Sequence, residues 1–154
     1  MDKRLILASG SPRRRALLAQ LGVNFDVYVP SVDESQKPNE DPTDYVTRIS
    51  SAKAQAVTGD VVLGADTCVS LNGTIYGKPS DLGHAEVILK ELSGKTHQVI
   101  TGVAVQFDGH LLNRVVQTDV EFIDVCQRAL DWYLDLGESL DKAGAYGLQG
   151  AAGA

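Results

Sequence analysis

The chain has 154 residues, of which 44% are hydrophobic and 22% charged, a composition typical of one folded globular domain and not of a disordered or fibrous protein. Fourteen basic against 20 acidic side chains give a net charge of −6, which excludes a protein-wide positive field for holding nucleic acid or an anionic membrane. An anionic ligand must therefore bind at a local site.

The sequence shows no targeting or membrane segment. No run approaches the ~18 apolar residues of a membrane span, and the apolar residues 5–8 are too few for a secretory signal. The two cysteines and three histidines are too far apart to predict a disulfide framework or a local zinc motif. We therefore expect a cytoplasmic protein without structural zinc.

The N-terminal part predicts a strand, a helix and a second strand. Residues 5–8 are an apolar run typical of a strand, and Ser11 and Pro12 are typical of a helix N-cap and first helical position. Apolar residues then alternate over 25–29, which predicts a half-buried strand. In the helix region Leu17, Leu18 and Leu21 recur at helical spacing, and Gly22 is typical of the end of the helix.

The middle of the chain predicts a helix, a buried strand and a hairpin. The residues at 41–42 repeat the cap-and-proline signal before a second amphipathic helix. The wholly apolar residues 61–63 predict a buried strand that delivers Asp66 at its end. An Asn-Gly pair at 72–73 is typical of a two-residue hairpin turn.

The remaining elements are a helix, a long hairpin and a last helix. Residues 80–92 have helical spacing, and apolar residues alternate on both sides of an Asp-Gly pair at 108–109. A fourth helix is expected at about 126–136. The end of the chain, 143–154, is rich in glycine and alanine.

These elements predict an α/β fold. Because strands alternate with helices but also pair as hairpins, we expect a mixed sheet in a single domain spanning 1–154. Trp132 and Tyr133 are expected in the core rather than on a base-stacking surface. Cys68 would suit a nucleophile, but its alternating strand and the lack of a nearby histidine favour a small buried hydrophobe.

The loop at 9–14 has the features of a phosphate site. Ser9 and Gly10 follow a strand, and the next helix begins with free N–H groups and a favourable dipole. Arg13 and Arg14 can grip phosphate oxygens. A capped helix with merely solvated arginines fits these residues equally well. The pattern lacks GxxxxGK[ST], so the loop is not a Walker P-loop.

Two carboxylates are candidates for holding a divalent metal or activating water. Asp66 follows a buried strand, where α/β sheets place their ligand sites. Glu34 lies beside Asp33 in an acidic loop, which alone is better explained as solvated. Lys53 and Lys78 could neutralise triphosphate charge, although most lysines only solubilise the surface.

Seven ordered blocks of sequence carry a resemblance that runs from one end of the chain to the other. They are LILASGSPRR at 5–14, VDE at 32–34, AKA at 52–54, LGADT at 63–67, GKP at 77–79, LSGKTHQVITGVAV at 92–105 and DKAGAYGLQG at 141–150. Together they resemble the Maf family of nucleoside triphosphate pyrophosphatases. The resemblance implies a two-lobed, mixed-sheet α/β fold similar to that of inosine triphosphatase, with the nucleotide in a cleft between the lobes.

The resemblance also implies roles for individual residues. Those expected at the nucleotide and metal site are Ser9, Arg13, Arg14, Glu34, Lys53, Asp66, Lys78 and Gln149. Asp66 is implied as the proton acceptor, and Lys53 and Lys78 complete the implied catalytic set. Glu34 and Asp66 would hold a divalent cation, Mg²⁺ or Mn²⁺. Arg13, Thr67 and Gln149 are similar to the branch that acts on dTTP and UTP.

The implied reaction is hydrolysis of a pyrimidine nucleoside triphosphate to the monophosphate and pyrophosphate, with removal of non-standard nucleotides as an implied role. A non-catalytic nucleotide-binding regulator of cell division is the alternative. The expected partner is the nucleoside triphosphate, with a homodimer as a further expectation and neither nucleic acid nor membrane as a partner.

Two departures from the family pattern are visible. Ala52 stands before Lys53, where the family usually has glutamate. Family members also continue with a further strand and a C-terminal helix, so we expect this chain to be C-terminally truncated. Gln149 would then lie on a Gly/Ala-rich end with high conformational entropy and nothing to pin it.

Overall fold

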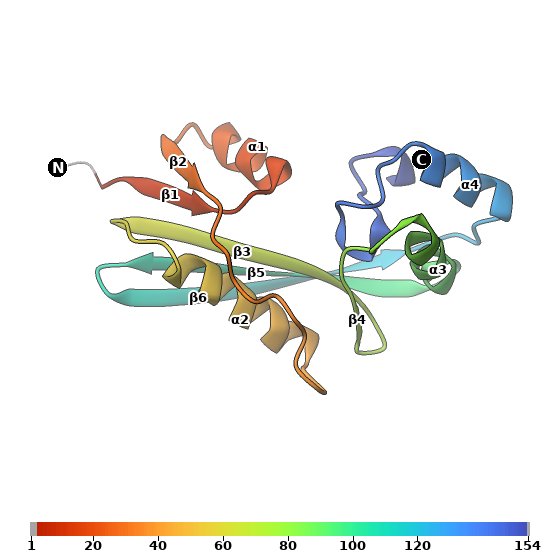
Figure 1. Ribbon diagram of the computed structural model, residues 1–154, viewed down its shortest axis with the longest axis horizontal. Coiled ribbons are helices and arrows are strands. Elements are labelled where there is room, and N and C mark those ends of the chain that lie inside the picture. Colours follow the sequence, from red (N-terminus) through yellow and green to blue (C-terminus); the bar gives the residue numbers. More distant parts are fainter. Residues whose placement is uncertain (1–2, 154) are drawn as a thin grey trace. The chain divides into compact units, whose positions relative to one another are not determined.

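The computed structural model describes residues 3–153, in which helices and strands alternate. The elements of the N-terminal half are β1 (Leu5–Ala8), α1 (Pro12–Gln20), β2 (Phe25–Tyr28), α2 (Pro42–Gln55) and β3 (Val61–Leu71). Those that follow are β4 (Thr74–Tyr76), α3 (Leu82–Leu92), β5 (Thr96–Phe107), β6 (His110–Glu121) and α4 (Gln127–Asp135) (Figure 1). Short 3-10 turns at Ala143–Ala145 and Ala151–Gly153 come last.

The strands form a mixed sheet, which confirms the expected fold class. The strand order is β2-β1-β3-β5-β6, and β4 pairs with β3. β1 runs parallel to both neighbours, with Leu5 opposite Phe25 on β2 and Val61 on β3. β4 is antiparallel to β3. Among the described residues, no helix has the length and apolar character to cross a bilayer.

The chain divides into two compact units, in agreement with the two lobes that the resemblance implies. The first unit comprises the residues up to Asp66 together with Thr101–Val116. The second comprises Thr67–Ile100 and the residues from Gln117 onward. The expected nucleotide cleft between the lobes stays a prediction.

In the first unit, α2 packs closely on β3. Asp41 caps the helix by accepting a hydrogen bond from the Thr43 N–H at 2.8 Å. A side chain at Gly64 of β3 would meet the backbone of α2, because its Cβ would lie 2.7 Å from the Ala54 nitrogen. The absence of that side chain lets the helix approach the strand. A small core that includes residues of both elements consists of Ala8, Ala54, Val57, Val62 and Ala104.

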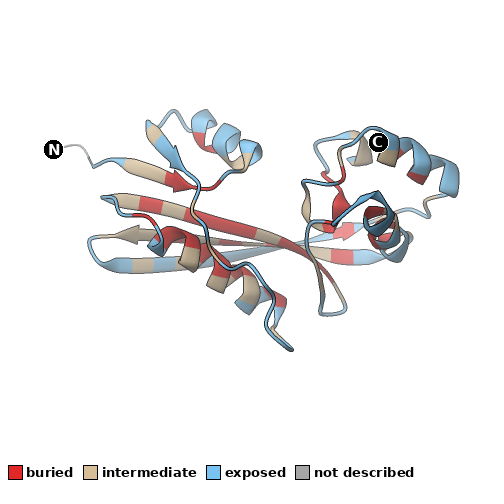
Figure 2. Ribbon diagram, in the orientation of Figure 1, coloured by how far each residue is buried: buried red, intermediate tan, exposed pale blue. Residues whose placement is uncertain are grey.

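The predicted helix α1 is confirmed, and most of its residues are exposed. Ser11 caps the helix as expected, accepting from the Arg14 N–H at 3.4 Å. Figure 2 shows α1 exposed over most of its length. Leu18 is buried, whereas Leu17 is 62% exposed and Leu21, just after the helix, is 72% exposed. The physical reason is that α1 lies next to β2, the edge strand of the sheet, so a single row of its side chains reaches the core.

The half-buried alternation predicted for residues 25–29 is wrong. Phe25 is partly buried, but Val27 and Tyr28 are exposed, because β2 has a neighbouring strand on one side only. By contrast, the two-residue turns at 72–73 and 108–109 are confirmed. Both residues of each turn have positive φ, as the favoured hairpin turn requires.

The strand predicted to end at Asp66 continues to Leu71. Small and apolar residues remain buried along it, among them Ala65, Cys68 and Val69. The same burial on both sides of Asp66 favours a strand that continues past it. Asp66 therefore lies in the middle of a strand and not at its end. The interpretation of Cys68 as a small buried hydrophobe is confirmed, since 1% of it is exposed.

In the second unit, α3, α4 and the last residues share one core. Its larger members are Val69, Ile88, Leu89, Leu92, Leu130, Tyr133 and Tyr146. The core position of Tyr133 is confirmed. The core position expected for Trp132 is wrong, since it is 53% exposed. Adjacent residues of an amphipathic helix point in different directions, so burial of Tyr133 leaves Trp132 facing solvent.

The expectation of an unpinned Gly/Ala-rich end is wrong within the described residues. Ala145 and Tyr146 are buried, and the Gly144 N–H donates to the Gly77 carbonyl at 3.1 Å.

The close approach of α2 and β3 yields a stability prediction. Gly64→Ala should lower the free energy of unfolding by about 1–3 kcal/mol, because its Cβ overpacks against helix backbone. Gly77→Ala is the matched control, since nothing lies within 4 Å of a Cβ there. Chemical denaturation measures both variants, and equal losses would show that the Gly64 contact does not hold the helix spacing.

Candidate active site

The candidate site is built around a buried ion pair. Lys53 of α2 places Nζ 2.7 Å from Oδ1 of Asp66 on β3, and the two side chains are 10% and 9% exposed. Oε1 of Glu34 lies 3.0 Å from the same Nζ, on a side chain that is 50% exposed. One ammonium group therefore joins the two carboxylates that the sequence singled out.

The environment of Asp66 suits a proton acceptor. Burial raises the pKa of its carboxyl group, and this effect outweighs the positive charges of Lys53 and Arg14, which act in the opposite direction. A carboxylate with a raised pKa takes up a proton more readily than an exposed one, which is the property required of a general base.

The predicted phosphate loop is tied to the strand that carries Asp66. Nη1 of Arg14 donates to the Ala65 carbonyl at 2.9 Å and to Oγ of Ser9 at 3.3 Å. The Ser11 N–H also donates to Oγ of Ser9, at 3.2 Å. Burial is the largest influence on the pKa of Arg14 and lowers it, whereas the charges of Asp66 and Glu34 raise it. Arg14 is thus a partly buried cation within the site and not a solvated surface arginine.

Tyr45 and Arg48 of α2 hold the loop that carries Glu34. The sequence analysis did not assign these two residues to the site. The Tyr45 hydroxyl donates to the Glu34 carbonyl at 3.0 Å, and Nη2 of Arg48 donates to the Ser35 carbonyl at 2.9 Å. Arg48 also binds Glu40, through Nε at 2.6 Å, and lowers the pKa of Glu40 to about 2. These partners are joined by an irregular loop, so no periodic signal in the sequence could have identified them.

The other predicted site residues are placed as follows. Arg13 is exposed in the first turn of α1. Thr67 is half-buried on β3, and Lys78 is exposed after β4. Gln149 is exposed in a turn at 147–150 that is closed by a 3.0 Å hydrogen bond.

The structure therefore brings together five of the predicted site residues in the first unit, namely Ser9, Arg14, Glu34, Lys53 and Asp66. Thr67, Lys78 and Gln149 belong to the second unit. The roles of all these residues stay predictions.

The donor set fits a divalent cation that is shared with a ligand. Within residues 3–153, no group of three or more histidine, cysteine, aspartate or glutamate side chains could hold a metal ion. Glu34 and Asp66 nevertheless converge on one point, the Lys53 ammonium. Mg²⁺ typically takes one or two carboxylates and completes its shell with phosphate oxygens and water. Glu34 and Asp66 match that number of carboxylates.

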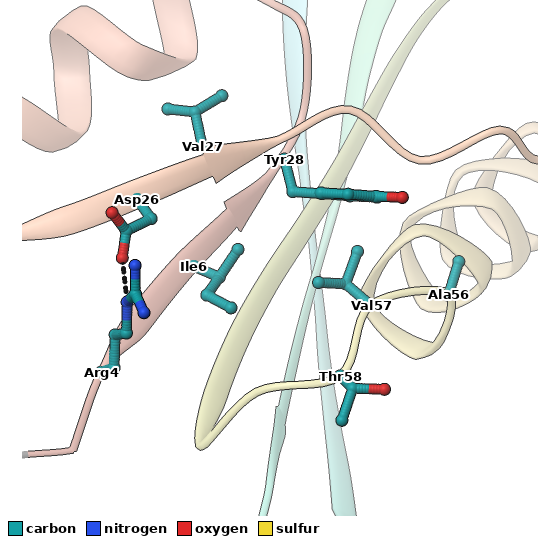
Figure 3. Close-up of a pocket in the computed structure, with 8 residues that line it drawn as sticks. All are labelled: Arg4, Ile6, Asp26, Val27, Tyr28, Ala56, Val57 and Thr58. Carbon is teal, nitrogen blue, oxygen red and sulfur yellow. Dashed lines mark hydrogen bonds and ion pairs between the residues drawn. The ribbon is translucent and has the colours of Figure 1, made fainter.

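A separate surface pocket of about 530 Å³ lies in the same unit. It is lined by Arg4, Ile6, Asp26, Val27, Tyr28, Ala56, Val57 and Thr58 (Figure 3). Arg4 and Asp26 form an ion pair at one side of it, and the Tyr28 ring and Val57 lie at the other. None of the predicted site residues lines this pocket, so it is distinct from the cluster at Lys53.

Comparisons with known proteins find a matching family and individual relatives. A family model described as "Maf-like protein" matches residues 4–154. A curated protein from Anaeromyxobacter dehalogenans (strain 2CP-C), named dTTP/UTP pyrophosphatase, is 50% identical over 158 residues, which cover 100% of this chain and 81% of the relative. A protein of the same name from Shigella sonnei is 49% identical over 154 residues, covering 97% of this chain and 78% of the relative.

The fold is also similar to that of solved structures. The Ham1 protein of Staphylococcus aureus matches with a TM-score of 0.56 at 18% identity, over 77% of this chain and 71% of that protein. At this identity the likeness establishes the architecture and carries no information on chemistry.

The buried pair yields a prediction that does not depend on activity. Lys53→Met should lower the free energy of unfolding by roughly 3–5 kcal/mol at neutral pH, because it leaves the Asp66 carboxylate buried without its counter-charge. Loss of the ammonium raises the pKa of Asp66 further. A folded-state pKa above the unfolded value gives stability at low pH that is lost as the pH rises through the folded value, so the defect should shrink in acid.

The matched control is the double variant Lys53→Met/Asp66→Asn, measured by denaturant unfolding across pH. Removing both charges should restore part of the lost stability and abolish its pH dependence. Additive losses in the two single variants would contradict a direct interaction between the residues.

Proposed function

Because the chain belongs to the Maf-like protein family, we propose that it hydrolyses the pyrimidine nucleoside triphosphates dTTP and UTP to the monophosphate and pyrophosphate. The two relatives that are about half identical to it carry the name dTTP/UTP pyrophosphatase. The observation that carries the proposal is the Lys53–Asp66 pair beside the Arg14 loop, since it joins a general base to cations suited to a polyphosphate.

Asp66 accepts the proton in the proposed reaction. A water molecule attacks the α-phosphorus, its proton passes to the Asp66 carboxylate, and the bond to the bridging oxygen breaks to release pyrophosphate. Lys53 fixes one carboxylate oxygen at 2.7 Å, which leaves the orientation of the carboxylate settled before the water arrives. Such preorganisation lowers the barrier because the charged group does not need to move during the reaction.

Cationic side chains stabilise the leaving pyrophosphate. Arg14 is held by the Ser9 hydroxyl and the Ala65 carbonyl, so its guanidinium group is fixed before a phosphate binds. Arg13 and Lys78 are exposed. Their side chains add positive charge and are free to move with the phosphates. Guanidinium groups match the geometry of phosphate oxygens, which supports an arginine-containing loop at this position.

We further propose that Mg²⁺ or Mn²⁺ binds at Glu34 and Asp66. The ion, when bound, neutralises phosphate charge and polarises the phosphoryl oxygens. Lys53 keeps the two carboxylates near each other through its 3.0 and 2.7 Å contacts. The half-exposed Glu34 side chain can turn toward a ligand, while Asp66 stays anchored.

Preference for a pyrimidine base is proposed to lie with Arg13, Thr67 and Gln149. The Gln149 amide offers both a donor and an acceptor to the edge of a base, and its position on an exposed turn supports this role. A homodimer, a cytoplasmic location, a role in removing non-standard nucleotides and the lack of nucleic-acid or membrane partners stay predictions.

The function is tested with a panel of nucleoside triphosphates in the presence of Mg²⁺ or Mn²⁺. Monophosphate and pyrophosphate are assayed separately from diphosphate and orthophosphate. We expect dTTP and UTP to give monophosphate and pyrophosphate, and purine nucleotides to react more slowly. Diphosphate and orthophosphate as main products would contradict the mechanism. Binding without turnover would favour the non-catalytic regulator of cell division.

The role of Asp66 is tested by Asp66→Asn, which keeps the shape of the side chain but removes the base. We expect kcat to fall by ~10²–10⁴-fold. The control is Asp135→Asn, an equivalent change at an exposed aspartate of α4, and thermal midpoints are recorded for both. Activity within a few-fold of the parent would reduce Asp66 to a structural carboxylate.

A further inference from the structure

A buried histidine in the second unit lies outside the residues assigned to the reaction. His97 of β5 is fully buried, and its ring meets Phe122 edge-on with 4.9 Å between centroids. Its Nε2 lies 2.6 Å from the hydroxyl oxygen of Tyr146. A polar ring inside a core costs free energy unless it is hydrogen-bonded, so the contact at Nε2 offsets part of that cost.

Tyr146 leads directly into the turn that carries Gln149. Tyr146 itself is 5% exposed, whereas Gln149 is exposed in the hydrogen-bonded turn at 147–150. On the far side of the turn, the Ala151 N–H donates to Oε2 of Glu138 at 3.2 Å. An exposed turn is therefore held at both of its ends by groups that are themselves buried or partly buried.

The residues before Tyr146 adopt an uncommon backbone conformation. Gly144 and Ala145 both have positive φ, at 69° and 63°, and the left-handed region is unfavourable for alanine. The Gly144 N–H donates to the Gly77 carbonyl at 3.1 Å, which links the segment to the residue before Lys78. Such a conformation persists only where the surroundings hold it, and the next residue, Tyr146, is buried.

We propose that His97 and Tyr146 are positioning residues that hold the 147–150 turn so that Gln149 meets the base of the nucleotide in one orientation. The inference rests on the proposed function, because it concerns recognition of the pyrimidine. Without the hydrogen bond the turn samples more conformations. Binding of the nucleotide must then order the turn, and the lost conformational entropy weakens the affinity. The pair therefore acts on KM and base preference and not on the chemical step.

The test compares two tyrosine variants from the same core. Tyr146→Phe removes only the hydroxyl that His97 contacts, and Tyr133→Phe makes the same change on α4, where the residue is 6% exposed. We expect Tyr146→Phe to raise KM for dTTP and UTP roughly 3- to 10-fold, the value of one hydrogen bond. Its kcat should stay nearly constant and its preference over purine nucleotides should fall, while Tyr133→Phe changes none of these.

The histidine side of the pair is tested by rescue. His97→Gln keeps a hydrogen-bonding side chain and should retain more of the base preference than His97→Leu, which keeps none. A lower kcat at unchanged KM in Tyr146→Phe, or equal effects in Tyr133→Phe, would overturn the proposal in favour of a general role in core stability.

Hydrogen exchange gives a readout that is independent of turnover. In Tyr146→Phe, the amides of residues 143–151 should exchange faster, while those of α4 and β6 keep the parent rates. Unchanged exchange in 143–151, or faster exchange throughout the unit, would overturn the proposal. If the parent hydrolyses no nucleotide, the proposed function fails, and the exchange result alone decides whether the pair holds the turn.

Discussion

The buried pair of Lys53 and Asp66 constrains the whole first unit. An ammonium and a carboxylate removed from water are costly unless they meet each other, and here they meet at 2.7 Å. Their contact requires α2 to lie close to β3, which Gly64 permits because it has no side chain to hold the helix off. The start of α2 at its Asp41 cap then determines which residue of the helix reaches the carboxylate.

The same pair links stability to chemistry. The burial that makes the pair costly also raises the pKa of Asp66, which suits a group that must take a proton from water. The helix that supplies Lys53 also holds the Glu34 loop through Tyr45 and Arg48. One helix thus places the Lys53 ammonium, orients the Asp66 carboxylate and holds the loop of Glu34.

Local signals explain what the sequence predicts well. The caps at Ser11 and Asp41 and the turns at 72–73 and 108–109 depend on residues within a few positions of one another. The five residues that meet in the first unit were singled out from motifs and family resemblance, because periodicity alone does not show which side chains converge. The exposure of Leu17 depends on the edge position of β2. The contact of His97 with Tyr146 spans 49 residues, and no spacing rule reaches that far.

In the proposed reaction, water attacks the α-phosphorus and Asp66 accepts its proton. The most direct measurement is hydrolysis of dTTP in ¹⁸O-labelled water, followed by mass analysis of both products. We expect the label in the monophosphate and unlabelled pyrophosphate, because attack at the α-phosphorus leaves the water oxygen on that phosphorus. Label in the pyrophosphate would mean attack at the β-phosphorus and would contradict the proposed reaction.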